Sequence, residues 1–139
     1  MRALVQRVSE ASVSVGDEVV GAIGPGMLVL LGVGPDDTPE VADRMAAKLR
    51  ALRIFEGPTG RMDEALGDRE ALVVSQFTLY ADTRRGNRPS FTGAASPELA
   101  EPLYERLRDA LGGRGGRFGA RMAVALVNDG PVTVLVELD

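Results

Sequence analysis

Cysteine and histidine are both absent from the 139-residue sequence. Without cysteine the chain has no disulfide framework and no thiolate nucleophile, and a cytosolic location is the default expectation. Without histidine it lacks the commonest general base and metal ligand, and a Ser-His-Asp triad is impossible within one chain. A metal site could use only oxygen ligands, and we expect no cofactor. Any catalysis must therefore use hydroxyls, amides, carboxylates, backbone dipoles or the substrate itself.

The motifs of common nucleotide-binding enzymes and of membrane proteins are also missing. The sequence contains neither G-x-x-x-x-G-K-[ST] nor G-x-G-x-x-G, and its nearest approach, "GAIGPG" (21–26), has the wrong glycine spacing. No apolar run approaches the roughly 18 residues of a membrane span. The start, "MRALVQRVSE", alternates like a strand and lacks a signal-peptide core. We expect one domain over residues 1–139, with no membrane partner.

Acidic residues outnumber basic ones, and the formal net charge is −4. This balance argues against broad electrostatic binding of nucleic acid, and we expect no DNA partner. The basic residues are nearly all arginine, and two groups of them stand out: Arg84, Arg85 and Arg88 in "TRRGNRPSF", and Arg114, Arg117 and Arg121 in "GRGGRFGAR". Guanidinium groups match phosphate in two-pronged geometry. Phosphate binding and a merely solvated face are both open at this point.

Strand patterns dominate the first third of the chain. Residues 2–8 alternate between two faces, with Arg7 on the same face as Ala3 and Val5. Residues 12–15 and 18–23 flank Gly16-Asp17 and predict a hairpin. The continuous apolar run 27–33 is typical of a strand buried on both faces.

Two helices are predicted from their start signals. Thr38-Pro39-Glu40 combines an N-cap hydroxyl, a proline at the first helical position and an acid, and an apolar stripe continues to Leu52. Ser96-Pro97-Glu98 opens a second helix, in which Pro102 predicts either a kink or a separate first turn. The remaining predictions are a short strand at 53–56, a loop at 61–70, and strands at 117–127 and 132–138 paired around "NDGP" (128–131).

The predicted strand 71–80 carries polar residues within a core-like pattern. By a period of two, Gln76 and Thr78 share one face, while Ser75 lies on the other with Phe77. These groups either satisfy neighbouring backbone and solvent or line a substrate pocket, where backbone N–H groups could stabilise an oxyanion. The Thr78 hydroxyl is a weak nucleophile, because the chain has no histidine to activate it.

Three further places are candidates for a site. Gly130 and Pro131 in "NDGP" form either an ordinary turn or a close approach of backbone to a ligand. Arg7 either lies exposed with its stem on apolar surface or is buried and needs acceptors. Phe118 in "GRFGAR" either belongs to the core or stacks on a base.

These segments, taken in order, closely resemble the D-aminoacyl-tRNA deacylase family. The resemblance rests on "MRALVQRV", "VVSQFTLYADTRRGNRPSF", "GRFGARM" and "VNDGPVT", and "GAIGPGMLVLLGV" and "LRIFE" also fit. It covers nearly the whole chain. The departures are peripheral: the region 63–71 is shortened, and "GGRGG" (112–116) is unusually rich in glycine.

The resemblance implies a fold, a partner and an activity. The fold would be α/β, a single compact domain of layered mixed β-sheets with two main helices packed on one side, forming a homodimer. The activity would be hydrolysis of the ester between a D-amino acid, or glycine, and the tRNA 3′ end, with L-aminoacyl-tRNA spared. The tRNA 2′-OH would help to activate water.

The same resemblance implies roles for particular residues. Gln76, Phe77 and Thr78 would form the catalytic segment, with the backbone N–H groups of Phe77 and Thr78 binding the oxyanion. Gly130 and Pro131, joined by a cis peptide, would reach in from the partner subunit and reject the L-enantiomer. The further site residues implied are Arg7, which would hold that dipeptide, Ser75 in the pocket, and Phe118 and Met122 near the terminal adenosine.

Two readings from other classes compete with this one. A non-catalytic RNA-binding module would use the arginine groups and would show salt-dependent binding to tRNA without turnover. A homo-oligomeric scaffold would show neither property.

Overall fold

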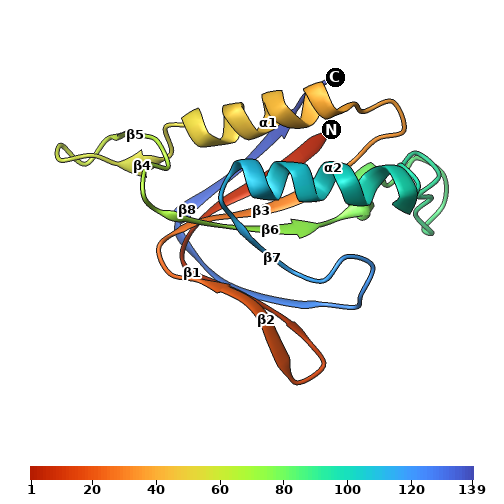
Figure 1. The fold of residues 1–139 in the computed structure, drawn as a ribbon, viewed down its shortest axis with the longest axis horizontal. Coiled ribbons are helices and arrows are strands. Elements are labelled where there is room, and N and C mark those ends of the chain that lie inside the picture. Colours follow the sequence, from red (N-terminus) through yellow and green to blue (C-terminus); the bar gives the residue numbers. More distant parts are fainter.

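A strongly curved six-stranded sheet runs through the computed structural model, which describes residues 1–139 (Figure 1). The strand order is β2-β1-β3-β6-β7, and β8 pairs with the other edge of β1. Its members are β1 (Arg2–Val15), β2 (Glu18–Ile23), β3 (Gly26–Gly32), β6 (Glu70–Ser75), β7 (Arg114–Gly115) and β8 (Ala123–Glu137). The predicted hairpin at Gly16-Asp17 is confirmed, but residues 2–8 and 12–15 belong to one long strand, β1. The strand predicted at 27–33 is β3.

Both predicted helices form with the predicted starts. Helix α1 (Pro39–Ala51) is capped by Thr38, whose side chain accepts a hydrogen bond from the Val41 N–H. Helix α2 (Pro97–Ala110) begins after Ser96, whose side chain makes no such bond. Pro102 lies inside α2 without dividing it. The missing N–H of Pro102 leaves only the carbonyl of Glu98 without a helical partner, and Glu98 is exposed at the helix start, where water can serve it.

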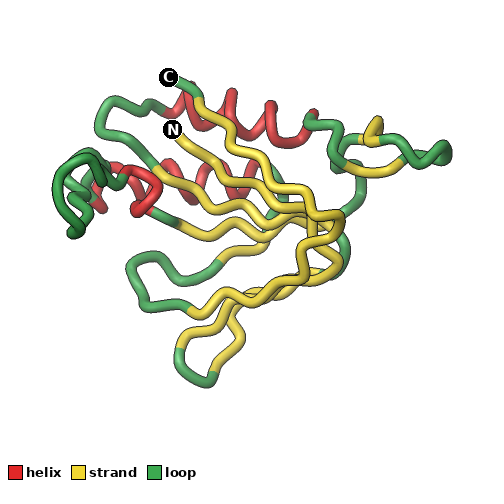
Figure 2. The backbone as a smooth tube through the Cα atoms, turned by 180° about the vertical axis from the view of Figure 1, so that it is seen from behind, coloured by secondary structure: helices red, strands yellow, loops and turns green.

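The two helices cover the same face of the sheet (Figures 1 and 2). Strands β3, β6 and β7 are neighbouring and parallel, so the chain needs one crossover from β3 to β6 and another from β6 to β7. Helix α1 lies in the first connection and α2 in the second. Crossovers of this kind are right-handed, and both step in the same direction along the sheet, which puts both helices on one side.

The curvature of the sheet gives the molecule two hydrophobic cores. The larger lies between the sheet and the helices and includes Val5, Val29 and Leu49. The smaller lies on the opposite face, where the curled ends of β1, β2 and β8 fold back, and includes Val13 and Leu28. The α/β fold with a mixed sheet and two helices on one side is therefore confirmed, its layers coming from one bent sheet.

Two predictions of local structure away from the polar segment 75–78 were wrong. The region 61–70 is not only a loop, because β5 (Met62–Glu64) pairs with β4 (Phe55–Glu56) in a small separate hairpin. Residues 117–127 and 132–138 do not pair with each other either. Residues 123–127 of the first segment and 132–137 of the second lie in the single strand β8, which pairs with β1, whereas residues 117–122 form no strand. A partner as long as β1 provides a ladder for both halves, and residues 129–132 bulge out between the pairs Val8↔Asn128 and Gln6↔Thr133.

Neither helix has the length and the apolar composition that crossing a lipid bilayer requires.

Candidate active site

The strand that carries the polar residues ends earlier than predicted. Strand β6 stops at Ser75, and the Gln76 N–H makes a last bond of 2.8 Å to the Leu31 carbonyl. The chain then turns into a 3₁₀ helix, η1 (Phe77–Tyr80). The strand predicted over 71–80, with its alternation of faces, is therefore wrong after Ser75. The side chains of Gln76 and Thr78 meet directly, with the Gln76 amide donating to the Thr78 hydroxyl.

The turn leaves two backbone donors at the start of η1. The Leu79 N–H donates to the Gln76 carbonyl at 3.2 Å, which is the first hydrogen bond of the helix. The N–H groups of Phe77 and Thr78 precede that bond and have no acceptor within the helix. Two successive amides at one helix start can bind a negatively charged oxygen.

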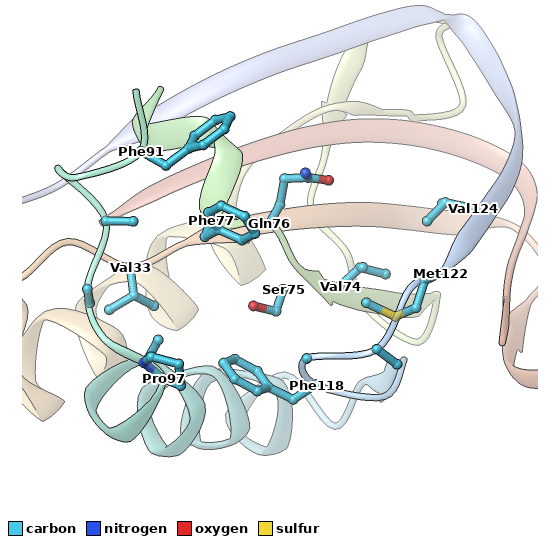
Figure 3. Close-up of a pocket in the computed structure, with 15 residues that line it drawn as sticks. Val33, Val74, Ser75, Gln76, Phe77, Phe91, Pro97, Phe118, Met122 and Val124 are labelled. Carbon is cyan, nitrogen blue, oxygen red and sulfur yellow. The ribbon is translucent and has the colours of Figure 1, made fainter. Parts of the chain in front are cut away.

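A pocket of about 500 Å³ opens beside this turn (Figure 3). It exists because β7 covers only Leu72 and Val73 of β6, so the edge of β6 is free beyond them. Five parts of the chain surround it: the residue after β3, the end of β6 with the start of η1, the loop before α2, the start of α2, and the segment that leads into β8. Its main lining residues are Val33, Val74, Ser75, Gln76, Phe77, Phe91, Pro97, Phe118, Met122 and Val124.

Helix α2 fixes the floor of the pocket through Tyr104. The buried Tyr104 hydroxyl donates to the Val73 carbonyl at 2.7 Å, and its ring lies 6.1 Å from that of Phe118. Burial raises the pKa of this hydroxyl. Of the residues predicted for the site, the structure thus brings together Ser75, Gln76, Phe77, Phe118 and Met122. Thr78 lies next to the pocket rather than in its lining.

Phe91 is a lining residue that sequence reasoning missed. Its ring meets that of Phe77 edge to face, with centroids 5.3 Å apart, at the rim of the pocket. Both rings are partly open to solvent, with Phe77 55% exposed. The signal was present in "NRPSF", where Phe91 ends a polar and glycine-containing stretch.

No ionisable side chain lines this pocket. The nearest phenol along the chain, Tyr80, lies behind the turn with the Arg2 guanidinium 4.5 Å over its ring. Burial, aided by the negative charge of Asp37, raises the pKa of Tyr80 to about 12. No group of three or more acidic side chains gathers in a way that could hold a metal ion. From this chain, the pocket offers backbone dipoles, amides and a hydroxyl group to a bound molecule.

Arg7 ties down the bulge of β8. It is 7% exposed, so of the two alternatives the buried one holds. Its Nε donates to the Asp129 carbonyl at 2.8 Å, and its Nη1 donates to the Ile54 carbonyl at 2.9 Å. The Asp129 carboxylate lies 3.7 Å away. The bulge is closed from within by Asn128, whose side chain accepts from the Val132 N–H.

Gly130 and Pro131, which follow Asp129, are exposed at the tip of the bulge and are joined by a cis peptide bond. Gly130 has φ +139°, and a side chain there would meet the Val132 N–H and the Arg7 guanidinium, so only glycine fits.

Gly130 and Pro131 do not line the pocket of their own chain. The bulge lies beside Arg7, which pairs with Met27 of β3, whereas Ser75 pairs with Leu31 of the same strand. Four residues of extended chain separate these two levels by about 13 Å. The two groups of predicted site residues are therefore held at different places within one chain.

A family model described as D-Tyr-tRNA(Tyr) deacylase matches residues 4–137. Similar proteins include the D-aminoacyl-tRNA deacylases of Roseiflexus sp. (strain RS-1), 60% identical, and of Thermotoga petrophila, 54% identical. These alignments span 99% of this chain, and 93% and 97% of the two relatives.

Among solved structures, the c-Myc DNA Unwinding Element Binding Protein is 40% identical with a TM-score of 0.93, covering 100% of this chain and 99% of that one. A probable eukaryotic D-amino acid tRNA deacylase shares the fold, with a TM-score of 0.84 at 19% identity, covering 99% and 98% of the two chains.

Proposed function

The chain belongs to the D-Tyr-tRNA(Tyr) deacylase family and is a hydrolase, and we propose that its substrate is the ester between a D-amino acid, or glycine, and the 3′ end of tRNA. The observation that carries this proposal is a pocket without an ionisable side chain beside two unpaired backbone donors. A reaction that needs no enzymic acid or base suits such a pocket. Aminoacyl-tRNA is used in translation, so the protein would act in the cytoplasm. It would need no cofactor.

The proposed reaction is substrate-assisted. The 2′-OH of the terminal ribose helps to activate a water molecule, which adds to the ester carbonyl carbon. The Phe77 and Thr78 N–H groups bind the oxygen that becomes negative. The bond between the acyl carbon and the ribose 3′-oxygen then breaks, and the leaving oxygen takes a proton. Gln76 orients the Thr78 side chain and the start of η1 through its hydrogen bond.

Positioning can supply the energy that such a mechanism requires. Well-oriented groups reach effective molarities equivalent to about 7–11 kcal/mol of the barrier. Ser75 and the Gln76 amide would orient the aminoacyl group, while Phe118 and Met122 on the opposite wall are suited to the terminal adenine ring.

Rejection of L-aminoacyl esters would come from a second subunit. We propose a homodimer in which Gly130 and Pro131 of one chain enter the pocket of the other. Their carbonyls would accept the α-amino group of the D-substrate, and an L-side chain would collide with them. Because this filter uses main chain rather than a side-chain pocket, it would tolerate many different amino acids.

Two features support the shared site. Gly130 and Pro131 are exposed and held away from their own pocket by Arg7. Strand β8 also pairs only with β1, so its outer edge is unpaired, and Val127 and Leu135 on it are 49% and 50% exposed. A long unpaired strand edge is a template for pairing with another chain, so this edge can take part in the proposed dimer.

One assay tests the function and its competitors. Purified protein is incubated with D- and L-tyrosyl-tRNA, and loss of the ester is followed. We expect cleavage of the D form alone. Binding of tRNA without cleavage would favour a non-catalytic RNA-binding module, and the absence of both would favour a scaffold. Equal cleavage of both enantiomers would contradict the proposed filter.

A further inference from the structure

We propose that Arg85, Arg88 and Arg121 bind the phosphates of the single-stranded 3′ end of tRNA on its way into the pocket. This inference rests on the proposed function. It begins from the pairing of the chain's cations, because an arginine that faces a carboxylate has to give up that contact before it can bind a ligand.

Most arginines of this chain have a partner. Arg84 holds the Asp82 carboxylate with two hydrogen bonds, at 2.9 and 2.7 Å, and this contact lowers the pKa of Asp82 to about 2. Arg114 lies 3.4 Å from Glu70, and Arg117 lies 3.3 Å from Glu18. Each of these three members of the two sequence groups thus already has a carboxylate partner.

The basic side chains without an ion pair or a side-chain hydrogen bond are few. They are Lys48, Arg61, Arg85, Arg88 and Arg121. Lys48 lies on α1 and Arg61 in the β4–β5 hairpin, far along the molecule from the pocket (Figure 1). The other three belong to the two loops that border the pocket, so three guanidinium groups without a partner lie at its entrance.

The two loops lie on opposite sides of the pocket. Phe91, which follows the loop of Arg85 and Arg88, and Phe118, which precedes Arg121, face each other across it (Figure 3). Figures 1 and 2 both show the two loops at the same end of the molecule, on either side of the end of β6. A strand of nucleic acid that enters the pocket between the two loops passes unpaired guanidinium groups on both sides.

The first loop is shaped to receive a ligand. The Asp82 and Ser90 backbones close its base with two hydrogen bonds, of 2.7 and 2.9 Å. Above them lies a depression of about 520 Å³ that only polar residues line, Arg85 and Arg88 among them. This depression is separate from the apolar pocket. Ser90 lines the depression and the next residue, Phe91, lines the pocket, so the two are neighbours.

The chemistry of this entrance favours a single-stranded nucleic acid over other anions. Guanidinium groups bind phosphate, while the exposed Phe77–Phe91 pair offers an aromatic surface for a base. A single-stranded nucleic acid alternates phosphates with bases, and a surface that alternates guanidinium groups with aromatic rings can bind both. The net charge of −4 keeps the rest of the surface from binding RNA broadly, so the attraction is local.

The test compares three D-tyrosyl substrates that differ in phosphates: the 3′-aminoacyl adenosine, which has none, an aminoacylated trinucleotide with a 5′-phosphate, and aminoacylated tRNA. The variants are Arg85→Ala, Arg88→Ala, Arg121→Ala and the triple variant. Arg61→Ala and Lys48→Ala serve as matched controls, because they remove equally unpaired charges elsewhere. The measured quantity is kcat/KM between 50 and 200 mM salt.

For the wild type, three single-strand phosphate contacts predict a slope of roughly −2 in a plot of log kcat/KM against log salt, or about a twentyfold loss over that range. Each single variant should reduce the slope by about 0.7, and the triple variant should be nearly insensitive to salt. Cleavage of the aminoacyl adenosine should stay unchanged in all variants, which shows that the pocket is intact.

The remaining outcomes are distinct. If the wild type cleaves none of the substrates, the proposed function fails. If it cleaves all three and the arginine variants match the Arg61→Ala control on tRNA, the phosphate contacts are overturned while the function stands. An effect on tRNA without one on the trinucleotide would move the contacts to the duplex stem and overturn the single-strand assignment.

Discussion

Thr78 is the only hydroxyl group at the start of η1 and lies beside the two free amides. Its oxygen accepts a hydrogen bond from Gln76, and it donates none to a carboxylate. In the proposed mechanism Thr78 contributes its backbone, and its side chain only holds the turn.

The variant Thr78→Ala separates these roles. We expect kcat on D-tyrosyl-tRNA to fall by less than about a hundredfold, because the backbone N–H stays in place. Loss of a true nucleophile would cost on the order of 10⁶-fold, as it does in serine hydrolases. Rapid-quench assays check this, and a trapped acyl-threonine in the wild type would refute the mechanism.

Tyr80 gives a second prediction, which concerns pH. Its pKa is raised from 10.0 to about 12 by burial and by Asp37, so the folded state holds the phenol proton more tightly than the unfolded chain. The contribution of the protonated phenol to the free energy of unfolding is therefore fully present below pH 10 and is lost as the pH rises toward 12.

We therefore expect Tyr80→Phe to unfold like the wild type at pH 7, because the Tyr80 hydroxyl donates no hydrogen bond there, and to lose less stability between pH 10 and 11.5. Urea denaturation across that range measures the difference. Tyr104→Phe is the contrasting variant, because it removes a bond to the Val73 carbonyl and should cost about 1 kcal/mol or more already at pH 7.

Helices α1 and α2 start with similar sequences but different caps. Thr38 accepts from the Val41 N–H at 3.3 Å, whereas the Ser96 side chain makes no cap bond. We expect Thr38→Ala to lower the free energy of unfolding by about 1 kcal/mol and Ser96→Ala to change it by a few tenths at most. Equal losses in chemical denaturation would show that the two caps are equivalent in solution.

The elements that sequence predicted well are those fixed by local signals. Thr38-Pro39 and Ser96-Pro97 mark the helix starts, and the turn at Gly16-Asp17 marks a hairpin, because capping and turn chemistry act over a few residues. The pairing of β8 could not be found in this way. "NDGP" has the composition of a hairpin turn, and only the length of β1 makes it a bulge in one strand.

The same distinction holds at the site. The polar residues 75–78 were found because they interrupt an apolar run, but the change from strand to 3₁₀ helix was not, since it depends on where β7 stops covering β6. The burial of Arg7 likewise depends on the Asp129 and Ile54 carbonyls, which are distant in sequence. Contacts between residues so far apart in the sequence leave no pattern among neighbouring residues from which they could be predicted.

For the molecule as a whole, the decisive question is whether two chains share each pocket. Gln76→Ala and Pro131→Ala would damage opposite contributions to the same site. Each homodimer should be impaired. Because random pairing makes half of the dimers mixed, and each mixed dimer has one fully intact site, refolding the two variants together should restore about a quarter of wild-type activity.

Activity after mixing is compared with that of each variant refolded alone, and sedimentation confirms the dimer. If the mixture equals the mean of the two variants, Gly130 and Pro131 act within their own chain or not at all. Undiminished activity in both homodimers would contradict the assigned roles of Gln76 and Pro131.

Strand β8 has a further consequence for how this chain can vary. Val124 borders the pocket and Gly130 follows six residues later, about 20 Å away in extended chain. Deleting one residue between them would turn every later side chain to the other side of the sheet and shift the Gly130–Pro131 carbonyls by one step. The turn at 57–61 can change in length without this effect. The part of β8 between Val124 and Gly130 cannot, because in the proposed dimer its length helps to decide which enantiomer of the substrate fits.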